Sequence, residues 1–406
     1  MDHAGMPSAG PMSDSALIVG AGQAAAQVAI SLRQGGFRGP VVIIGAEPYL
    51  PYQRPPLSKK FLSSPQTPES LLLRPHGFWR DQDVALELGT AVGAVDRRRR
   101  CVTLTNGREL AYANLVFATG TSARALLIPG VDRRGVHSLR NIEDVRRLRI
   151  ELDCARRVVI IGGGYIGLEV AAVMRGEGRD VTVLEAEERV LKRVTGDTIS
   201  AFFDAFHRDK GVDIRLNVRA AGISGDERVR SVRTSQEEDL PADAVLIAAG
   251  ARANDDLAAA AGIGCRDGIL VDETARTDSA DIYAVGDCTR FPSRRYGRRL
   301  RLESVQNAID QAKVAAASIL GRAEKYDPVP WFWSDQYDLK LQIAGLADDH
   351  DFQQTIGDVA RPRFSVEYRK SGRLVAVDAV NDARAHMTAR RRIAEETAAA
   401  EMAVGP

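Results

Sequence analysis

Two glycine-rich segments of the same kind occur in this chain, and each has the sequence context of a strand that turns into a helix. The first, residues 20–25 (GAGQAA), follows the apolar run 16–19, and the second, residues 162–167 (GGGYIG), follows the apolar run 158–161. Glycine is needed where a buried strand turns sharply into a helix and where the backbone must approach a pyrophosphate. The helix N-terminus then offers free N–H groups and a partial positive charge. Two such units predict two bound dinucleotides and electron transfer between them.

Length and composition limit the class of protein. A chain of 406 residues is too long for one ordinary core, so two or three domains are expected. Hydrophobic residues make up 45% and charged residues 27%, as in soluble globular proteins. The net charge of +1 argues against general attraction to nucleic acid or to an acidic membrane. No apolar run reaches membrane-spanning length, and residues 1–14 lack the parts of a signal peptide, so we expect a disordered extension on a cytoplasmic protein.

The order of strand and helix patterns predicts an α/β fold in which one dinucleotide domain interrupts another. Residues 16–45 have the pattern of strand, helix and strand, and a second unit of this kind begins at Val158. Near residue 250 the pattern returns to the first domain, because a strand at 281–287 is followed by a helix at 305–320. We therefore assign residues 15–118 and 251–326 to a discontinuous first domain, and 119–250 to a second.

The end of the chain has a different pattern. Pro328 and Pro330 mark a boundary, and residues 331–382 alternate like antiparallel strands before a helical tail at 383–402. We expect a C-terminal α+β domain over residues 327–406. The predicted architecture is thus two Rossmann-like domains, one for each dinucleotide, and a smaller third domain.

An acid follows the second strand of each dinucleotide unit. Glu47 and Glu185 stand about 20 residues beyond their glycine turns, where an acid accepts hydrogen bonds from ribose hydroxyls. Such an acid repels a 2′-phosphate, so Glu185 favours NADH over NADPH. The alternative stays open, because Arg189, Lys192 and Arg193 follow closely and could reach a phosphate.

The two dinucleotides are expected in different units. The first glycine turn belongs with the later turn at Gly286-Asp287 and the helix after it, a composite that suits a permanently held FAD. Asp287 could accept hydrogen bonds from the ribityl chain, and the N-terminus of helix 305–320 could stabilise the anionic reduced flavin. The second turn lies in a self-contained insert, as expected for an exchangeable nicotinamide.

Five segments together resemble a known family. They are residues 54–59 (RPPLSK), 118–120 (ATG), 162–169 (GGGYIGLE), 283–287 (YAVGD) and 331–336 (WFWSDQ). Over residues 15–382 the chain resembles the NADH-dependent ferredoxin reductases of bacterial oxygenase systems, the family of putidaredoxin reductase and biphenyl dioxygenase reductase. The resemblance implies a glutathione-reductase-like fold, FAD and NADH as cofactors, and a 2Fe–2S ferredoxin as the electron acceptor.

The resemblance also implies roles for individual residues. Lys59 would lie near the flavin N5, paired with Glu169, which would orient the nicotinamide amide, and Trp333 would lie on the opposite side of the site. These three residues are the expected catalytic group. The expected FAD contacts are Gly20, Gly22, Ala25, Glu47, Arg54, Lys59, Thr119, Gly120, Arg124, Asp287, Glu303, Gln306 and Trp333. The expected NAD contacts are Gly162, Gly164, Tyr165, Gly167, Glu169, Glu185, Arg193 and Gly250.

The chain departs from the family pattern in two places. Its first turn ends in Ala25 where glycine is usual, although alanine is tolerated where helix and strand pack closely. The stretch 382–387 is also atypical, which weakens any expectation about partner contacts there.

The cysteines argue against related activities. Residues 48–70 contain no cysteine, whereas disulphide reductases and the peroxide-reducing or NADH-oxidising relatives use cysteine in this region. The four cysteines lack CxxC or metal-ligand spacing, so we expect buried thiols in a reducing compartment and no metal site. The six histidines belong to no motif, and we expect them to be structural or exposed.

Residues 290–301 contain several arginines and no acid. A solvated loop and a landing site for an acidic ferredoxin are both open readings, and docking there would depend on salt. The stretch contains Arg290, Arg294, Arg295, Arg298, Arg299 and Arg301, of which we expect Arg294, Arg295, Arg298 and Arg299 to contact the partner. We expect a monomer or weak dimer.

Two alternatives remain for the function. One is an NADH-responsive flavoprotein similar to apoptosis-inducing factor, which shares the Pro-Pro-Leu-Ser-Lys element. The other keeps the enzyme and changes the acceptor to rubredoxin or a quinone.

Overall fold

The computed structural model describes residues 14–322 and 324–403, with side chains described up to Thr397. The expected extension at residues 1–14 therefore lies almost wholly outside the described residues. The chain forms two compact units. The first combines the described residues up to Gln53 with Pro68–Ser122 and Arg252–Asp327, and the second combines Arg54–Thr67, Ala123–Ala251 and the described residues from Pro328 onward.

The first unit is organised around a parallel sheet of five strands in the order β19-β7-β1-β2-β3. Parallel strands covered on both faces are apolar throughout, and all four residues of β1 are buried. The strands are β1 (Ala16–Val19), β2 (Val41–Gly45), β3 (Val84–Leu88), β7 (Asn114–Phe117) and β19 (Ile282–Ala284). The last strand comes from a distant part of the sequence, so the chain leaves this unit and returns to it.

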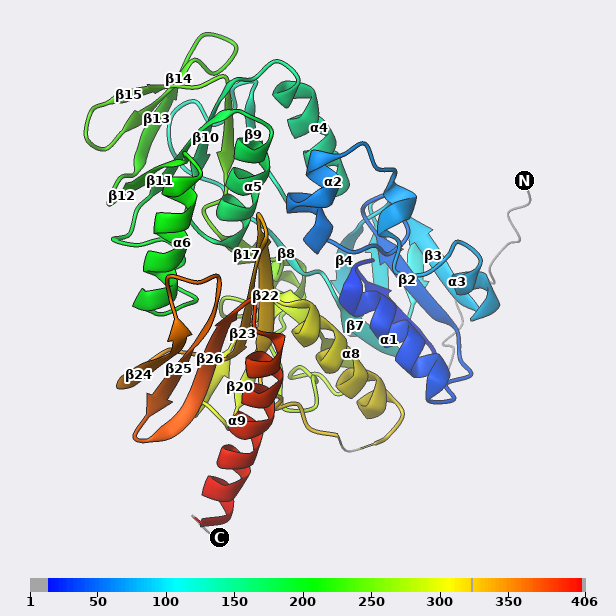
Figure 1. The fold of residues 1–406 in the computed structure, drawn as a ribbon. Coiled ribbons are helices and arrows are strands. Elements are labelled where there is room, and N and C mark those ends of the chain that lie inside the picture. The colour runs from blue at the N-terminus through cyan, green and yellow to red at the C-terminus, as the bar shows by residue number, and fades with distance from the viewer. Residues whose placement is uncertain (1–13, 323, 404–406) are drawn as a thin grey trace. The chain divides into compact units, whose positions relative to one another are not determined.

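Helices α1 (Gln23–Gln34) and α8 (Val305–Ile319) pack side by side in the first unit (Figure 1). Small side chains make this close approach possible, because both buried faces are rich in alanine. The Ser304 hydroxyl caps α8 by accepting a hydrogen bond from the Asn307 N–H. The remaining elements are η1 (Pro55–Ser58) and α2 (Lys60–Ser63), which belong to the second unit, and η2 (Pro68–Leu71), α3 (Phe78–Asp81), β4 (Val92–Asp96), β5 (Cys101–Leu104), β6 (Glu109–Ala111), α7 (Asp256–Ala260), β18 (Ile269–Leu270), η3 (Gly286–Cys288), β20 (Thr289–Ser293) and β21 (Arg298–Leu300).

The second unit contains a parallel sheet with the equivalent order β12-β11-β10-β16-β9. Helix α5 (Tyr165–Gly176) follows β10 directly, and α4 (Ile142–Leu152) begins with a capping box formed by Asn141 and Asp144. The other elements here are β9 (Val136–Ser138), β10 (Arg157–Ile161), β11 (Asp180–Glu185), α6 (Asp197–Asp209), β12 (Asp213–Leu216), β13 (Ala220–Ser224), β14 (Ser231–Thr234), β15 (Asp239–Pro241) and β16 (Ala244–Ile247), with β8 (Thr121–Ala123) and β17 (Ala251–Ala253) at the unit boundaries.

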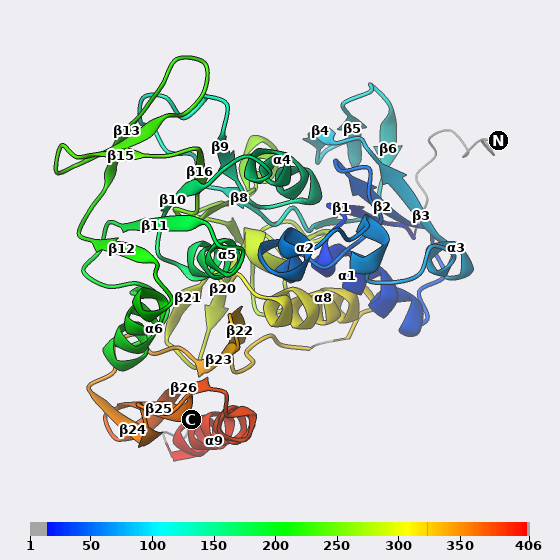
Figure 2. The ribbon, with the colours of Figure 1, turned by 45° about the horizontal axis from the view of Figure 1, so that its top comes forward.

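The C-terminal part of the second unit is an antiparallel sheet in the order β22-β23-β26-β25-β24, covered on one face by α9 (Ala383–Ala403) (Figure 2). Leu374 and Val377 of the sheet form a small core with Ala389 and Ile393 of the helix. The strands are β22 (Trp331–Gln336), β23 (Leu339–Gly345), β24 (Phe352–Asp358), β25 (Arg363–Lys370) and β26 (Arg373–Val380). The predicted antiparallel region and the predicted helical tail are both confirmed.

Some elements differ from the sequence pattern. Asn106 and Gly107 lie in the turn between β5 and β6, and β6 has only three residues. The arginine-rich stretch 290–301 is not a loop, because β20 and β21 pair as an antiparallel hairpin. Helix α4 was not predicted, although its Asn-x-x-Asp start is a usable local signal.

Candidate functional site

The first glycine turn joins β1 to α1. Gly20 has a φ of +115°, and a Cβ atom there would lie 2.2 Å from the Ala118 carbonyl oxygen, so this position requires glycine for the fold itself. Gly22 is different: its φ of −94° suits any residue, and within the described part of the chain no atom lies within 4 Å of an added Cβ. Ala25, the expected departure from the pattern, is completely buried.

Other expected FAD residues gather at the same edge of the first sheet. The Thr119 hydroxyl donates to the Asn254 carbonyl oxygen at 2.6 Å, and Gly120 has a φ of +64°. An added Cβ at Gly286 would lie 3.1 Å from the Ala24 Cβ, which brings the turn before Asp287 against the first turn of α1. The sheet edge therefore collects segments that are far apart in the sequence.

The expected acid and the start of α8 are also in the first unit. The Glu47 carboxylate accepts a hydrogen bond from the Tyr52 hydroxyl at 2.6 Å. Glu303 is paired with Arg301, and Gln306 is buried and donates to the Asp310 carboxylate at 2.9 Å. Among the described residues, the Gln306 side-chain oxygen has no hydrogen-bond partner.

The second glycine turn repeats this geometry between β10 and α5. Gly162 has a φ of +115°, and its added Cβ would lie 2.4 Å from the Ala248 carbonyl oxygen. Gly164 has a φ of −81° and, like Gly22, no protein atom within 4 Å of an added Cβ. Gly167 requires glycine, because its Cβ would lie 2.0 Å from the Gly162 oxygen.

The residues expected to surround NAD lie around this turn. Glu185 accepts hydrogen bonds from the Gly163 N–H at 2.7 Å and from the Glu187 N–H at 2.9 Å, so each of its carboxylate oxygens accepts a hydrogen bond from a backbone N–H group. Gly250 has a φ of +96°, and its carbonyl oxygen accepts from the Arg124 N–H at 2.9 Å. The Arg193 guanidinium would be 3.3 Å from a Cβ at Gly250, which places these groups together.

Lys59 and Glu169 form an ion pair inside the second unit. The Lys59 Nζ lies 2.7 Å from the Glu169 Oε2, with side-chain exposures of 19% and 5%. Segment 54–59 brings Lys59 to α5, where Glu169 stands in the second turn. The Arg54 guanidinium donates to the Arg140 carbonyl oxygen at 2.8 Å, which anchors the start of this segment.

Two hydroxyl groups that the sequence did not indicate complete the Glu169 environment. The Ser58 hydroxyl donates to Oε2 at 2.5 Å, and the Ser334 hydroxyl donates to Oε1 at 2.6 Å. Both serines stand inside segments that carry the family resemblance, but the resemblance assigns roles to their neighbours Lys59 and Trp333. Nothing in the local sequence indicated that they meet, because Ser58 and Ser334 lie in segments separated by most of the chain.

Trp333 is not brought to this ion pair. Side chains alternate along β22, so Trp333 faces away from the side on which Ser334 reaches Glu169. Its ring lies 5.8 Å from the ring of Trp331. On the Ser334 side, Phe332 packs against Tyr165 with ring centroids 4.5 Å apart, which covers the first residue of α5.

The two turns fit the pyrophosphates of two dinucleotides. No side chain among residues 14–322 and 324–397 caps the N-terminus of α1 or α5, so the first N–H groups of both helices remain available to a ligand. Gly22 and Gly164 have neither backbone strain nor a crowded protein neighbourhood that would exclude a side chain. The space beside them is what a close-approaching ligand needs.

The expected arginine patch carries more internal ion pairs than its sequence implied. Arg294 lies 2.7 Å from Glu273, and Arg290 lies 3.4 Å from Asp267. Arg299 donates to the Val271 carbonyl oxygen at 2.8 Å. The acids come from segments outside 290–301, which is why the stretch looked uniformly basic in sequence.

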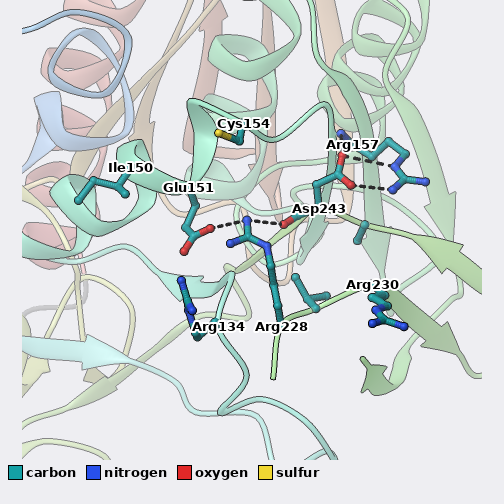
Figure 3. A pocket seen from close by; sticks show the side chains of 10 residues that line it. Arg134, Ile150, Glu151, Cys154, Arg157, Arg228, Arg230 and Asp243 are labelled. Atoms are coloured by element: carbon teal, nitrogen blue, oxygen red, sulfur yellow. Dashed lines mark hydrogen bonds and ion pairs between the residues drawn. The ribbon is translucent and has the colours of Figure 1, made fainter. Parts of the chain in front are cut away.

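A separate cavity of about 540 Å³ lies in the second unit, near the C-terminal end of α4 and the start of β10 (Figure 3). Arg228 is paired with Glu151 at 2.5 Å and Arg157 with Asp243 at 2.6 Å. None of the expected site residues lines it. Cys154, which does, is exposed and Cys265 is half-buried, so the expectation of four buried cysteines is wrong; only Cys101 and Cys288 are buried.

Comparison with known proteins assigns the chain to a family. Residues 14–312 match the pyridine nucleotide-disulphide oxidoreductase family, and residues 331–405 match the reductase C-terminal family. The chain belongs to the pyridine nucleotide-disulphide oxidoreductases, and is therefore an oxidoreductase with FAD and NAD(H) as its cofactors.

Individual relatives cover nearly the whole chain. A ferredoxin–NAD(P)(+) reductase from Sphingomonas sp. is 45% identical, covering 93% of this chain and 92% of the relative. The crystal structure of the ferredoxin reductase for the CYP199A2 system of Rhodopseudomonas palustris matches with a TM-score of 0.89 at 42% identity, covering 91% of each chain. The covalent putidaredoxin reductase–putidaredoxin complex matches with a TM-score of 0.91 at 39% identity, covering 94% and 93%.

No helix in the described part of the chain is both long enough and apolar enough to span a membrane.

Proposed function

We propose that this protein transfers electrons from NADH, through bound FAD, to a 2Fe–2S ferredoxin that serves an oxygenase. The observation that carries the proposal is the pair of open glycines, Gly22 and Gly164, each at an uncapped helix N-terminus. Relatives named as ferredoxin reductases, at 39–45% identity over most of the chain, support the choice of acceptor.

FAD is assigned to the first unit and NADH to the second. The domain limits that follow are 15–118 with 251–326 for FAD, 119–250 for NAD and 327–406 for the C-terminal domain. The support for FAD is that Asp287 and the start of α8 come to the glycine turn from a later part of the chain, so the pocket is assembled from more segments. The turn at Gly162–Gly164 is built mainly from one continuous segment, which suits a ligand that exchanges.

Bound FAD would supply the chemistry that links a two-electron hydride donor to a one-electron acceptor. The protein's contribution is binding, orientation and charge. The N-termini of α1 and α5 bind the pyrophosphates, and Glu185 disfavours a 2′-phosphate on the adenosine ribose. The Lys59 ammonium and the Glu169 carboxylate form an ion pair at 2.7 Å, and the carboxylate can orient a nicotinamide amide. Trp333 is proposed to border the flavin, as the family resemblance implies.

Anaerobic addition of NADH to the purified yellow protein tests the first half of the reaction. We expect rapid bleaching of the flavin absorbance by NADH and much slower bleaching by NADPH. Unbleached flavin would end the proposal, and equal rates with the two nucleotides would remove the assigned role of Glu185.

The acceptor is tested by steady-state reduction of a 2Fe–2S ferredoxin, a rubredoxin and a soluble quinone side by side. We expect the ferredoxin to give the highest kcat/KM. Slow turnover with every acceptor, together with NADH-dependent dimerisation, would instead support a signalling flavoprotein.

The ferredoxin docking surface is proposed to include Arg294, Arg295, Arg298 and Arg299. Arg294, Arg298 and Arg299 are exposed, which permits contact with a partner, and acidic surfaces on the partner would accelerate association at low salt. The internal pair between Arg294 and Glu273 reduces the net charge of the patch. We propose a monomer or weak dimer in solution.

Replacing these four arginines with glutamate tests the docking surface. The expected result is a kcat/KM for ferredoxin lowered on the order of 100-fold at low salt, with ferricyanide reduction unchanged, since the small anion needs no docking surface. Loss of both activities, or of neither, would contradict the assignment.

A further inference from the structure

A line of buried side chains leads away from Glu169 through the C-terminal sheet to helix α6. Ser334 donates to Glu169 Oε1 at 2.6 Å, and the Gln336 side-chain nitrogen donates to the Ser334 hydroxyl at 3.2 Å. The Gln336 oxygen lies 2.8 Å from the His207 Nε2. Ser334, Gln336 and His207 are completely buried, and Glu169 is 4% exposed.

Chemistry allows this line only one direction. The Glu169 Oε1 is an acceptor at the start of the line, since the Ser334 hydroxyl donates to it. Ser334 must then donate its single hydroxyl proton to Glu169 and accept from the Gln336 NH₂ group. The Gln336 oxygen is left as an acceptor, which requires His207 to carry its proton on Nε2.

The surroundings of His207 agree with a neutral ring in that tautomer. Among the described residues its Nδ1 is buried without a hydrogen-bond partner, which a lone pair tolerates better than an N–H would. Burial lowers the pKa of the His207 imidazole, although the Gln336 hydrogen bond opposes this. The Tyr337 ring centroid lies 5.2 Å from the imidazole centroid. The charge of Asp204, on the same helix, acts to raise the pKa of the imidazole.

We propose that Ser334, Gln336 and His207 are positioning residues that act as a one-way hydrogen-bond line, holding the Glu169 carboxylate correctly oriented toward the nicotinamide. This inference rests on the proposed function, because it concerns the NADH half-reaction. The line joins three elements of the second unit, β22, α6 and α5. The C-terminal sheet therefore contributes to the proposed NADH site and not only to the stability of the unit.

The two oxygens of Glu169 have separate sets of donors. Oε2 receives Lys59 and Ser58 from segment 54–59, whereas Oε1 receives Ser334 from β22. Every donor in the line points its positive end toward Glu169, so the dipoles add in a region shielded from water. Burial, followed by the charges of Asp378 and Glu169, raises the pKa of Tyr165, which makes Tyr165 a titratable neighbour of this carboxylate.

The first test needs no variant. In the oxidised holoprotein labelled with ¹⁵N-histidine, the His207 ring nitrogens should show the neutral Nε2–H tautomer at pH 7, and the ring should protonate only at a lower pH than a free imidazole, since burial lowers its pKa. Assignment is made with His207→Gln, whose spectrum loses that signal. A Nδ1–H tautomer or an imidazolium at pH 7 would overturn the proposed direction.

The second test is kinetic. Ser334→Ala removes the Oε1 donor, so the rate constant for flavin reduction by NADH should fall on the order of tenfold at pH 7, with the acidic limb of its pH profile moved upward by about one unit. Ser334→Thr retains a hydroxyl and should restore most of the rate and the original profile. Gln336→Leu should give a smaller loss in the same direction.

Ser200→Ala is the matched control. Ser200 is also a completely buried hydroxyl, on α6, but it donates to the Val190 carbonyl oxygen and not to the line. It should leave the rate and the pH profile unchanged. Equal losses in Ser334→Ala and Ser200→Ala, or an unmoved pH profile in Ser334→Ala, would overturn the proposal.

The two proposals fail in different ways. If NADH does not reduce the flavin of the wild-type protein, the proposed function fails, whereas the His207 tautomer can still be read. If NADH reduces it and Ser334→Ala is indistinguishable from wild type, only the positioning line fails.

Discussion

The turn at Gly20–Gly22 in the first unit and the turn at Gly162–Gly164 in the second have nearly the same backbone, but the fold completes the sheet around them differently. Both first glycines have a φ of +115° and pack on the carbonyl oxygen of an alanine. Both sheets have the same order, yet the outer strand next to β7 is β19, from much later in the chain, whereas the strand next to β16 is β9, which comes shortly before β10 in the same unit.

The difference shows which parts of a dinucleotide site are local and which are assembled. The glycine geometry is set by two adjacent elements and is therefore repeated. The groups that face the rest of the ligand differ: Glu47 is held by Tyr52, while Glu185 holds the backbone of its own turn. On the proposed assignment, one fold element supports a retained ligand in one unit and an exchangeable ligand in the other.

The largest effect is expected from adding one methyl group to each open glycine. Gly22→Ala should weaken FAD retention on the order of 100-fold, and Gly164→Ala should weaken NADH binding by a similar factor without loss of FAD, because each methyl occupies ligand space and no protein space. The flavin absorbance per mole of protein measures FAD retention, and titration with NADH measures NADH binding.

Gly176→Ala is the control for those variants, since its added Cβ also meets no atom within 4 Å but lies at the end of α5. Gly176→Ala should change neither FAD retention nor NADH binding. If both Gly22→Ala and Gly164→Ala affected the same ligand, the assignment of one dinucleotide to each unit would be wrong.

The second unit contains a buried acid whose titration should be visible in its stability. Burial raises the pKa of Asp378 to about 7, although the Tyr368 hydroxyl 2.9 Å away opposes this. A raised folded-state pKa contributes stability that is complete below the unfolded pKa of about 3.9 and is lost as pH rises to about 7. The unfolding free energy of Asp378→Asn, relative to wild type, should therefore rise by about 1.4 kcal/mol per pH unit between pH 5 and 6.5.

Denaturant unfolding at several pH values measures this difference, which should level off above pH 7 because the acid is then ionised in both states. Tyr368→Phe is a useful companion, since it removes a hydrogen bond to the same carboxylate. A pH-independent difference between Asp378→Asn and wild type would show that Asp378 is already ionised in the fold.

A smaller effect is expected from replacing Glu185. Glu185→Ala should raise the KM for NADH about tenfold and narrow the preference over NADPH, because the ribose loses an acceptor and the turn loses its hold on the Gly163 N–H. Glu188→Ala, which removes only an exposed ion pair with Lys192, serves as the control. An unchanged ratio of NADH to NADPH activity would assign Glu185 to the turn alone.

The smallest effect is expected at the third position of the first turn. Ala25→Gly should lower stability by about 1 kcal/mol through helix propensity, without changing flavin content. Thermal unfolding of the holoprotein measures it. A loss of FAD from Ala25→Gly would mean that the alanine methyl contributes to the flavin pocket itself.

The sequence predicted the local parts of this molecule well. The apolar strands before Gly20 and Gly162, the helices after them and the antiparallel C-terminal region all follow from periodicity and turn residues. The short strand β6 and the hairpin β20–β21 were missed, because their residues have weak strand patterns and their pairing is decided by neighbours. The arginine stretch 290–301 was read without its acids, since Asp267 and Glu273 lie elsewhere in the chain.

What the sequence by itself determined is the pair of glycine turns, because the strand, the turn and the helix that make each one are adjacent in the chain. What only the tertiary structure decided is the environment of Glu169. Its donors Ser58 and Ser334 lie 111 and 165 positions away, and His207 reaches it only through β22. No local pattern can specify such a group, since a buried carboxylate selects its donors by position in space and each donor alone is an ordinary serine, glutamine or histidine.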